Sequence, residues 1–302
     1  MISIIGAGRV GSAVAFLAAQ NGLDDIVLVN RTKNKAVGEE LDLVSTIPGK
    51  SLISVTGTDD ISKIKNSDVI VIAVGGGVIK EERIDLLPFT APVISEICKN
   101  LRKYADEAKI VVVTNPVDII TYQIIKQTEF PRERVFGIGS SLDSSRLRYL
   151  IAKKLGVKQG EIDGFVIGEH GPTMVPLFSH AKSRGEKIIF SEKIMLELAS
   201  EVQNYWRSLI SFKGASVFGA AKNTFDIVKS IVDDKELLAP VSVYLKGEYG
   251  FSDISMGVPV VFGKDGMKDI VKLSLSQTES ELLHLSAKRI HDGIARLLNI
   301  VK

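Results

Sequence analysis

The chain has 302 residues, enough for two domains of ordinary size or one large α/β unit. Apolar residues make up 45% and charged residues 25%, a composition that excludes a disordered or fibrous chain. The formal net charge of +2 favours neither a nucleic-acid nor a membrane partner. No apolar run reaches the roughly 18 residues of a membrane span, and residues 1–5 lack the charge pattern of a signal peptide. We therefore expect a cytoplasmic protein with a small-molecule partner.

An apolar run at residues 2–5 breaks at a glycine-rich turn and continues as small and apolar residues. This order predicts a strand, a tight turn and a helix, the context in which a G-x-G-x-x-G spacing indicates a dinucleotide site. The glycines permit the turn, the approach of a pyrophosphate and close helix packing. A purely structural turn is the alternative. At the helix N-terminus, which favours an anion, cofactor contacts are expected from Gly6, Gly8, Arg9, Val10 and Gly11.

The second predicted strand, residues 26–29, ends where NAD-binding chains carry a carboxylate for the ribose. Asn30 occupies this position and is followed by Arg31, Thr32 and Lys33. A carboxylate that would repel a 2′-phosphate is absent, and the cations Arg31 and Lys33 lie beside this position. The pattern therefore favours NADP over NAD. The alternative is that Arg31 and Lys33 only form the solvated start of a helix.

Strands and helices alternate through the first half of the chain, which predicts a parallel sheet with right-handed crossovers. We expect an α/β protein with an N-terminal Rossmann domain at residues 1–140 and a mixed α+β catalytic domain at 141–302. Further strands are predicted near residues 53–55, 69–74, 110–113, 135–138, 242–245 and 255–262, and helices near 35–44, 87–104, 141–155, 193–209 and 276–298.

The predicted strand at residues 69–74 is followed by three glycines, beginning with Gly75, and then by a charged segment that ends at Arg83. Glycines at the carboxyl end of a parallel strand are typical of a mobile loop over a site. Gly75 is expected near the cofactor, and Arg83 could reach a substrate. Alternatively, Arg83 only pairs with Glu81 or Glu82. Asn115 ends the next strand at the same edge, where its amide can donate and accept hydrogen bonds.

His170 is the leading catalytic candidate, because it lies in a glycine-bracketed turn after an apolar run. Histidine can exchange a proton near neutrality, and glycines allow close approach, although residue type alone leaves a structural role equally open. Asp143 and Arg146 are three residues apart and share one face of a predicted helix. They form a local ion pair, or else Asp143 orients a histidine while Arg146 binds a carboxylate with its planar fork.

Four motifs occur in the order and at the spacings of the malate and lactate dehydrogenase family, which the chain resembles over its whole length. The resemblance is strongest to the malate dehydrogenase branch, of an archaeal-like kind. The motifs are Gly6-x-Gly8-x-x-Gly11, Thr114-Asn115-Pro116, Leu142-Asp143-Ser144-x-Arg146 and Gly168-x-His170-Gly171.

The resemblance implies hydride transfer between a 2-hydroxy acid, malate above all, and NAD or NADP, by a homodimer or homotetramer. It implies that His170 accepts the proton, that Asp143 orients His170 and that Arg83 polarises the reacting carbonyl. Arg146 would bind the C1 carboxylate of the substrate, and Asn115 would contact the substrate and the nicotinamide ribose.

Several positions depart from the pattern of the family and concern the choice of substrate. Where malate dehydrogenases carry a second loop arginine, this chain has Gly77 or Val78, and Lys80 is the nearest cation. Pro172 stands where the family has an aspartate after the histidine–glycine pair. Ser216 stands at the pocket position that is threonine in lactate enzymes. Residues 173–177 resemble the malate branch. Malate is therefore favoured, with Lys80 and Ser216 at the substrate, and L-lactate or another 2-hydroxy acid is the alternative.

Two other classes of function are alternatives to a 2-hydroxyacid dehydrogenase. The NAD-requiring family 4 glycosidases have a related fold but need a metal held through cysteine and histidine. Cys98, the single cysteine, lies in a helical pattern far from the motifs, and His284 and His291 are too far apart on the last helix to share a metal. We therefore expect no metal site. A non-catalytic dinucleotide sensor is disfavoured by the set of Asp143, Arg146 and His170. Trp206 carries no functional signal.

Overall fold

The computed structural model describes residues 1–75, 80 and 82–301. The expectations for Gly77, Val78 and Glu81 concern positions outside the described residues.

Six parallel strands form one half of the main sheet, in the order β3-β2-β1-β4-β5-β6. This is the strand order of a dinucleotide-binding Rossmann fold, so the predicted α/β class with an N-terminal parallel sheet is confirmed. The central strands are buried throughout and rich in β-branched residues, as a sheet covered on both faces requires. The strands are β1 (Ile2–Ile5), β2 (Ile26–Val29), β3 (Val55–Thr58), β4 (Val69–Ile72), β5 (Lys109–Val112) and β6 (Val135–Gly137).

Four of these strands differ from the predicted bounds. β5 begins and ends one residue earlier, at Lys109 and Val112, and β6 ends one residue earlier, at Gly137. β3 begins at Val55 rather than at residue 53, and β4 ends at Ile72 rather than at residue 74. The chain leaves β4 early because it passes close to the glycine turn: a Cβ added to Gly6 would lie 2.6 Å from the carbonyl oxygen of Ala73. The end of β4 and the turn after β1 are thereby held side by side.

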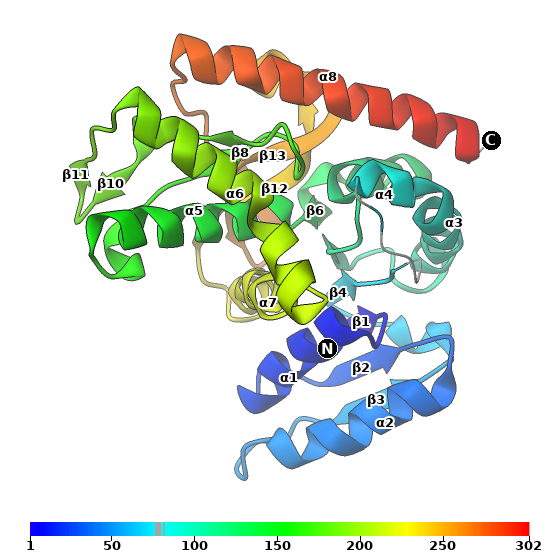
Figure 1. Cartoon of the computed structure of the whole chain (residues 1–302). Helices are drawn as coiled ribbons and strands as arrows, with labels where there is room; N and C mark the ends of the chain where they lie inside the picture. The colour runs from blue at the N-terminus through cyan, green and yellow to red at the C-terminus, as the bar shows by residue number, and fades with distance from the viewer. Residues whose placement is uncertain (76–79, 81, 302) are drawn as a thin grey trace.

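Four helices accompany this half of the sheet. Figure 1 shows α1 and α2 beside the blue strands β1 to β3, while α3 and α4 lie together on the other side of β4. Their bounds are α1 (Arg9–Gln20), α2 (Lys33–Leu43), α3 (Leu87–Tyr104) and α4 (Val117–Thr128).

The main sheet continues into the C-terminal half of the chain, which the sequence did not predict. Three antiparallel strands, β12 (Leu237–Lys246), β13 (Ser252–Gly263) and β14 (Gly266–Ile270), extend it to nine strands. They join the parallel half where Ser242 pairs with Gly137. A Cβ on Gly137 would lie 3.2 Å from the Cβ of Ser242 and 2.6 Å from the Oγ1 of Thr121. Glycine at this position therefore lets the two halves approach closely.

The remaining C-terminal elements are helices and two small sheets. The helices are α5 (Gly139–Leu155), α6 (Glu192–Lys213), α7 (Phe218–Val232), which the sequence did not predict, and α8 (Gln277–Ile300). α5 begins at Gly139, so the expected domain boundary near residue 140 falls in its first turn and stays a prediction. Two small sheets contain β7 (Ile162–Asp163), β8 (Val166–Ile167), β9 (Val175–Pro176), β10 (Lys182–Ser183) and β11 (Glu186–Lys187).

Two hydrophobic cores hold these layers together. The larger lies around the nine-stranded sheet and includes residues of α1, α3, α4, α7 and α8. The smaller lies under α5 and α6 and includes Leu147, Ile151 and Val202. α5 contributes to both cores, so the helix that carries Asp143 and Arg146 is fixed on two sides.

No helix of the described residues is long and apolar enough to cross a membrane. No group of three or more His, Cys, Asp or Glu side chains in this part of the chain could hold a metal ion. Cys98 is buried in α3, and burial raises the pKa of its thiol to about 12.

Candidate active site

The carboxyl ends of β1, β4 and β5 meet at one edge of the sheet, beside the first turn of α5. In open α/β sheets this is where ligands bind, at the point where the strand order reverses. A cavity of about 330 Å³ lies here. Among its lining residues are Val10, Lys80, Arg83, Asn115, Arg146, His170, Trp206 and Ser216. The structure therefore brings together side chains that the sequence had placed far apart.

The glycine turn has the geometry of an anion cradle. Gly6 has φ +111°, and a Cβ on Gly11 would lie 2.0 Å from the carbonyl oxygen of Gly6, so both positions need glycine. Gly8, by contrast, faces open space, with no atom within 4 Å of an added Cβ. It is the N-cap of α1, and no side chain caps the helix. Free N–H groups at this N-terminus fit a diphosphate.

The residues expected around the adenosine end of a cofactor lie further along the same edge. Asn30 follows β2, and its Nδ2 donates to the carbonyl oxygen of Thr32 at 3.2 Å. Arg31 is exposed. Gly75 follows β4 and has open space where a Cβ would lie. These positions suit contacts to a ribose and its substituents, and neither charge nor shape here excludes a 2′-phosphate.

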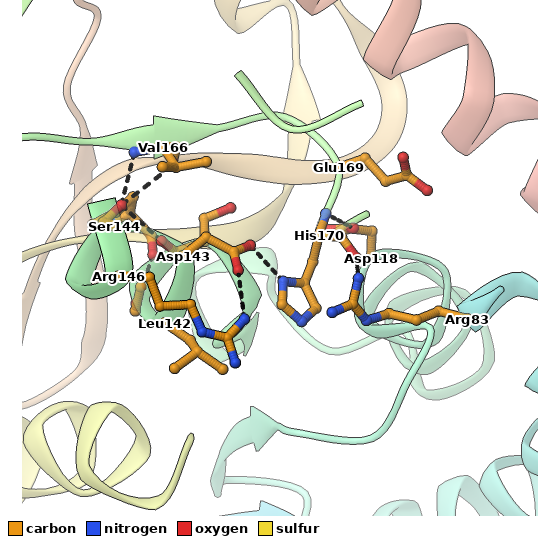
Figure 2. Close-up of polar contacts among 12 residues, drawn as sticks. Arg83, Asp118, Leu142, Asp143, Ser144, Arg146, Val166, Glu169 and His170 are labelled. Carbon is orange, nitrogen blue, oxygen red and sulfur yellow. Dashed lines mark hydrogen bonds and ion pairs between the residues drawn. The ribbon is translucent and has the colours of Figure 1, made fainter. Parts of the chain in front are cut away.

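His170 lines the cavity and forms a buried pair with Asp143 (Figure 2). The Nδ1 of His170 lies 2.5 Å from the Oδ2 of Asp143, and both side chains are shielded from solvent. This contact leaves Nε2 for a ligand. A Cβ on Gly139 would lie 2.4 Å from the Cβ of His170, so the start of α5 can approach the imidazole only because residue 139 is glycine. The orienting contact predicted from the sequence is present.

Two arginines flank the imidazole from different elements (Figure 2). Arg83 opens a short 3₁₀ helix, Arg83–Leu86, and its Nη1 donates to the carbonyl oxygen of His170 at 3.1 Å. Arg146 lies one turn after Asp143 on α5, with its Nη1 3.3 Å from the Oδ1 of Asp143. Its Nη2 donates to the Oγ of Ser216 at 3.0 Å. Two guanidinium groups beside one histidine make a site for an anionic substrate.

The electrostatic environment sets the protonation of this cluster. Burial lowers the pKa of His170 and the charge of Arg83 lowers it further, against the opposing effect of Asp143. His170 is therefore neutral at neutral pH and ready to accept a proton. Burial alone would raise the pKa of Asp143, but His170, Arg146 and Arg83 hold it below its usual range. Asp143 thus stays ionised and can stabilise an imidazolium.

Three residues of the site have positions that the sequence does not predict. Trp206 of α6 lines the cavity, with the Cζ of Arg83 5.9 Å from the centroid of its ring. The turn that carries His170, residues 168–173, is called the catalytic turn below. Asp118 of α4 is buried beside it and accepts a hydrogen bond from the backbone N–H of His170 at 2.7 Å. Burial raises the pKa of its carboxyl to about 7. Glu169 precedes His170 and accepts from the hydroxyl of Thr173 at 2.5 Å. Only the adjacency of Glu169 to His170 was visible in the sequence.

Asn115 and Lys80 line the same cavity. The side-chain oxygen of Asn115 is buried and has no hydrogen-bond partner among the described residues. An orphaned acceptor in a cavity fits a ligand that carries a hydroxyl or amide donor. Lys80 is exposed, and its Nζ lies 5.6 Å from the centroid of the Phe89 ring.

Comparison with known proteins defines the class to which this fold and site belong. The family model described as "lactate/malate dehydrogenase, NAD binding domain" matches residues 1–137. The model described as "lactate/malate dehydrogenase, alpha/beta C-terminal domain" matches residues 140–301. The chain belongs to the lactate/malate dehydrogenase family, a family of NAD-binding oxidoreductases.

Individual relatives fall on both branches of the family. The chain is 34% identical to a malate dehydrogenase of Staphylococcus saprophyticus over 309 aligned positions, which cover 99% of this chain and 98% of that protein. The solved malate dehydrogenase of Aeropyrum pernix has a TM-score of 0.92 and 33% identity, with 98% of each chain covered. A lactate dehydrogenase of Cryptosporidium parvum, solved with lactic acid and β-nicotinamide adenine dinucleotide, has a TM-score of 0.95 and 29% identity, covering 99% of this chain and 98% of that one.

Proposed function

We propose that this protein is a malate dehydrogenase that transfers hydride reversibly between malate and oxaloacetate with a nicotinamide dinucleotide. The observation that supports this most directly is the buried contact of His170 with Asp143, flanked by Arg83 and Arg146 at the cavity next to the glycine turn. A sensor that only binds a dinucleotide would have no need of an oriented base and two arginines in one cavity.

The proposed roles follow from these contacts. When bound, the nicotinamide ring accepts or supplies the hydride. In the oxidation direction, neutral His170 takes the hydroxyl proton at Nε2, and ionised Asp143 stabilises the imidazolium at Nδ1. Arg146 binds the C1 carboxylate with its planar fork, held in place by Asp143 and Ser216. Arg83 stabilises the negative charge that develops on the reacting oxygen during reduction. Reduction reverses the proton transfer.

Substrate choice is proposed to depend on Lys80. Oxaloacetate carries a second carboxylate, which would be costly to bury without a countercharge. Lys80 is a cation among the described lining residues that has no role toward the first carboxylate. A lactate-type substrate ends in an apolar methyl group and would gain nothing from this cation. A preference for pyruvate over oxaloacetate would favour the alternative, L-lactate or another 2-hydroxy acid.

The cofactor is proposed to be NADP in preference to NAD. Asn30 stands where a carboxylate would repel the 2′-phosphate, and exposed Arg31 adjoins it. Arginine can contact a phosphate in a bidentate, charge-assisted manner. NAD(H) itself is supported by the family, whose N-terminal model is an NAD-binding domain, and by the lactate dehydrogenase of Cryptosporidium parvum that was solved with this dinucleotide.

Three further proposals come from the resemblance and from the chain itself. We propose that residues 1–140 bind the dinucleotide and that residues 141–302 form the catalytic domain. The assembly is proposed to be a homodimer or homotetramer located in the cytoplasm. Size-exclusion chromatography with light scattering would measure the oligomeric state, and a monomer at micromolar concentration would contradict that part.

One spectrophotometric panel tests the proposed function. Oxaloacetate and pyruvate are each combined with NADH and NADPH, in buffer containing a chelator. We expect the highest kcat/KM for oxaloacetate with NADPH. A higher kcat/KM for pyruvate would overturn the malate assignment, and turnover that needs an added divalent metal would overturn the metal-free mechanism.

A further inference from the structure

A third arginine, Arg289 of α8, joins the two segments that carry Arg83 and His170. Its Nη2 lies 2.7 Å from the Oε2 of Glu82, the residue immediately before Arg83. Its Nε lies 3.1 Å from the Oε1 of Glu169, the residue immediately before His170. Arg289 is not among the described residues that line the cavity. It therefore touches the neighbours of both proposed catalytic residues from outside the site.

On the side toward His170, further contacts join α8 to the turn that carries this residue. The backbone N–H of Glu169 donates to the Oγ of Ser286 at 2.5 Å, so α8 contacts the catalytic turn at two points three residues apart on one helix face. The Oε2 of Glu169 accepts from the hydroxyl of Thr173 within the same turn. A Cβ on Gly168 would lie 2.5 Å from the Oγ of Ser286, which shows how closely α8 approaches.

The side of the bridge toward Arg83 completes a closed ring of contacts. Arg289 binds Glu82, Glu82 is followed by Arg83, and Arg83 donates to the carbonyl oxygen of His170 at 3.1 Å. His170 follows Glu169, which returns to Arg289. Of the five links in this ring, two are covalent and three are charge-assisted contacts. A guanidinium group that is part of such a ring can adopt fewer orientations than one held by a single contact.

We propose that Arg289 is a positioning residue that holds Arg83 in register with the catalytic turn. The inference rests on the proposed roles of Arg83 and His170. Arginine suits this task because its Nε and Nη2 can each meet a different carboxylate, whereas the ammonium group of a lysine is a single point charge. The ion pair with Glu82 is partly exposed, at 30% for Arg289 and 54% for Glu82, so water screens it. The main effect of removing Arg289 should therefore be on the placement of Arg83 rather than on folding.

The test uses Arg289→Met and Arg289→Lys, with two control variants on the same helix. Arg296→Met removes the contact of α8 with Asp85, 3.5 Å long, which lies in the same 3₁₀ helix as Arg83. Lys288→Met removes an ion pair within α8, with Asp292. Neither control touches Glu82 or Glu169 in the described structure.

The first measurement needs no substrate. Trp206 is the single tryptophan of the chain, and Arg83 lies over its ring. The Cζ of Arg207 lies nearer the same ring, 5.0 Å from its centroid, so acrylamide quenching of the fluorescence reports on Arg83 by comparison with Arg83→Met. We expect Arg289→Met to raise the quenching constant as Arg83→Met does, Arg289→Lys to raise it less, and both controls to match the wild type. A quenching constant unchanged in Arg289→Met but raised in Arg83→Met would overturn the proposal.

The second measurement is steady-state kinetics with oxaloacetate. Arg83 acts on charge that develops in the transition state, so Arg289→Met should lower kcat while changing KM little. We expect a loss of about tenfold, below the roughly hundredfold that a 1 Å misplacement of a catalytic group can cause. Arg289→Lys should recover part of it, and the dissociation constant for the cofactor should not change. Equal kcat in wild type and Arg289→Met would contradict the inference alone. An inactive wild type would contradict the proposed function, and the quenching result would still decide whether Arg289 holds Arg83.

Discussion

The pKa of His170 should move in opposite directions when its two charged neighbours are removed one at a time. The carboxylate of Asp143 contacts Nδ1 at 2.5 Å and favours the imidazolium, while the guanidinium of Arg83 opposes it. Asp143→Asn should therefore lower the pKa of His170 further, and Arg83→Met should raise it. Both replacements are close in size to the original side chain, so neither leaves a large cavity.

The magnitude for Asp143→Asn follows from the geometry of the contact. An opposite charge at hydrogen-bond distance moves a pKa by about 1 to 3 units, and each unit corresponds to about 1.4 kcal/mol. The imidazolium formed during oxidation would lose this stabilisation. A transition state that carries most of that charge predicts a fall in kcat of about tenfold to a thousandfold. An amide at residue 143 could also hold the wrong tautomer of His170, which adds to the loss.

The assay is the pH dependence of kcat/KM for malate oxidation, which reports ionisations of the free enzyme. Oxidation needs neutral His170, so the rate falls as the pH drops through the pKa of His170. Because that pKa is lowered in the folded protein, the acid limb of the wild type should lie below the ordinary value of 6.5. The limb should move to lower pH in Asp143→Asn and to higher pH in Arg83→Met. A shift of both variants in the same direction would refute the electrostatic reasoning.

Three further variants probe packing, substrate and cofactor. Gly139→Ala should lower kcat and should lower Tm by several degrees, measured by calorimetry, because its Cβ would lie 2.4 Å from that of His170. Wild-type values of both would show that α5 can shift freely. Lys80→Met should reduce kcat/KM for oxaloacetate about tenfold more than for pyruvate, and equal losses would remove Lys80 from the pocket. Asn30→Asp with Arg31→Ala should raise KM for NADPH and lower it for NADH. The ratio of the two kcat/KM values should change by the equivalent of a few kcal/mol at most. A wild type that already prefers NADH tenfold would sink that assignment.

Local patterns were enough to predict the parallel half of the fold. The buried apolar strands and the glycine turn have short-range signatures, so β1, α1 and the sheet class could be read from the sequence. The junction between Ser242 and Gly137 could not, because pairing between distant strands leaves no periodic signal in either segment. α7 carries such a signal and could have been predicted, because Ala221, Phe225 and Val228 recur at helical spacing and form its buried face.

The site divides in the same way. His170, Asp143 and Arg146 stand out because their chemistry or their spacing is unusual, and the structure places them in contact. Asp118 and Arg289 gave no signal, since a carboxylate inside a helix or an arginine on an amphipathic helix is most often solvated. Their contacts with the catalytic turn arise from elements 52 and 120 residues away along the chain. Such residues can be found only once the backbone is in place.

The central claim, that His170 is the base, is tested most directly by His170→Asn. The amide keeps a polar group near Asp143 but cannot exchange a proton at neutral pH. We predict that kcat for malate oxidation falls by at least about a hundredfold, the usual contribution of general acid–base catalysis, while the dissociation constant for NADPH, measured by fluorescence titration, stays that of the wild type. A variant that turns over at close to the wild-type rate would contradict the account.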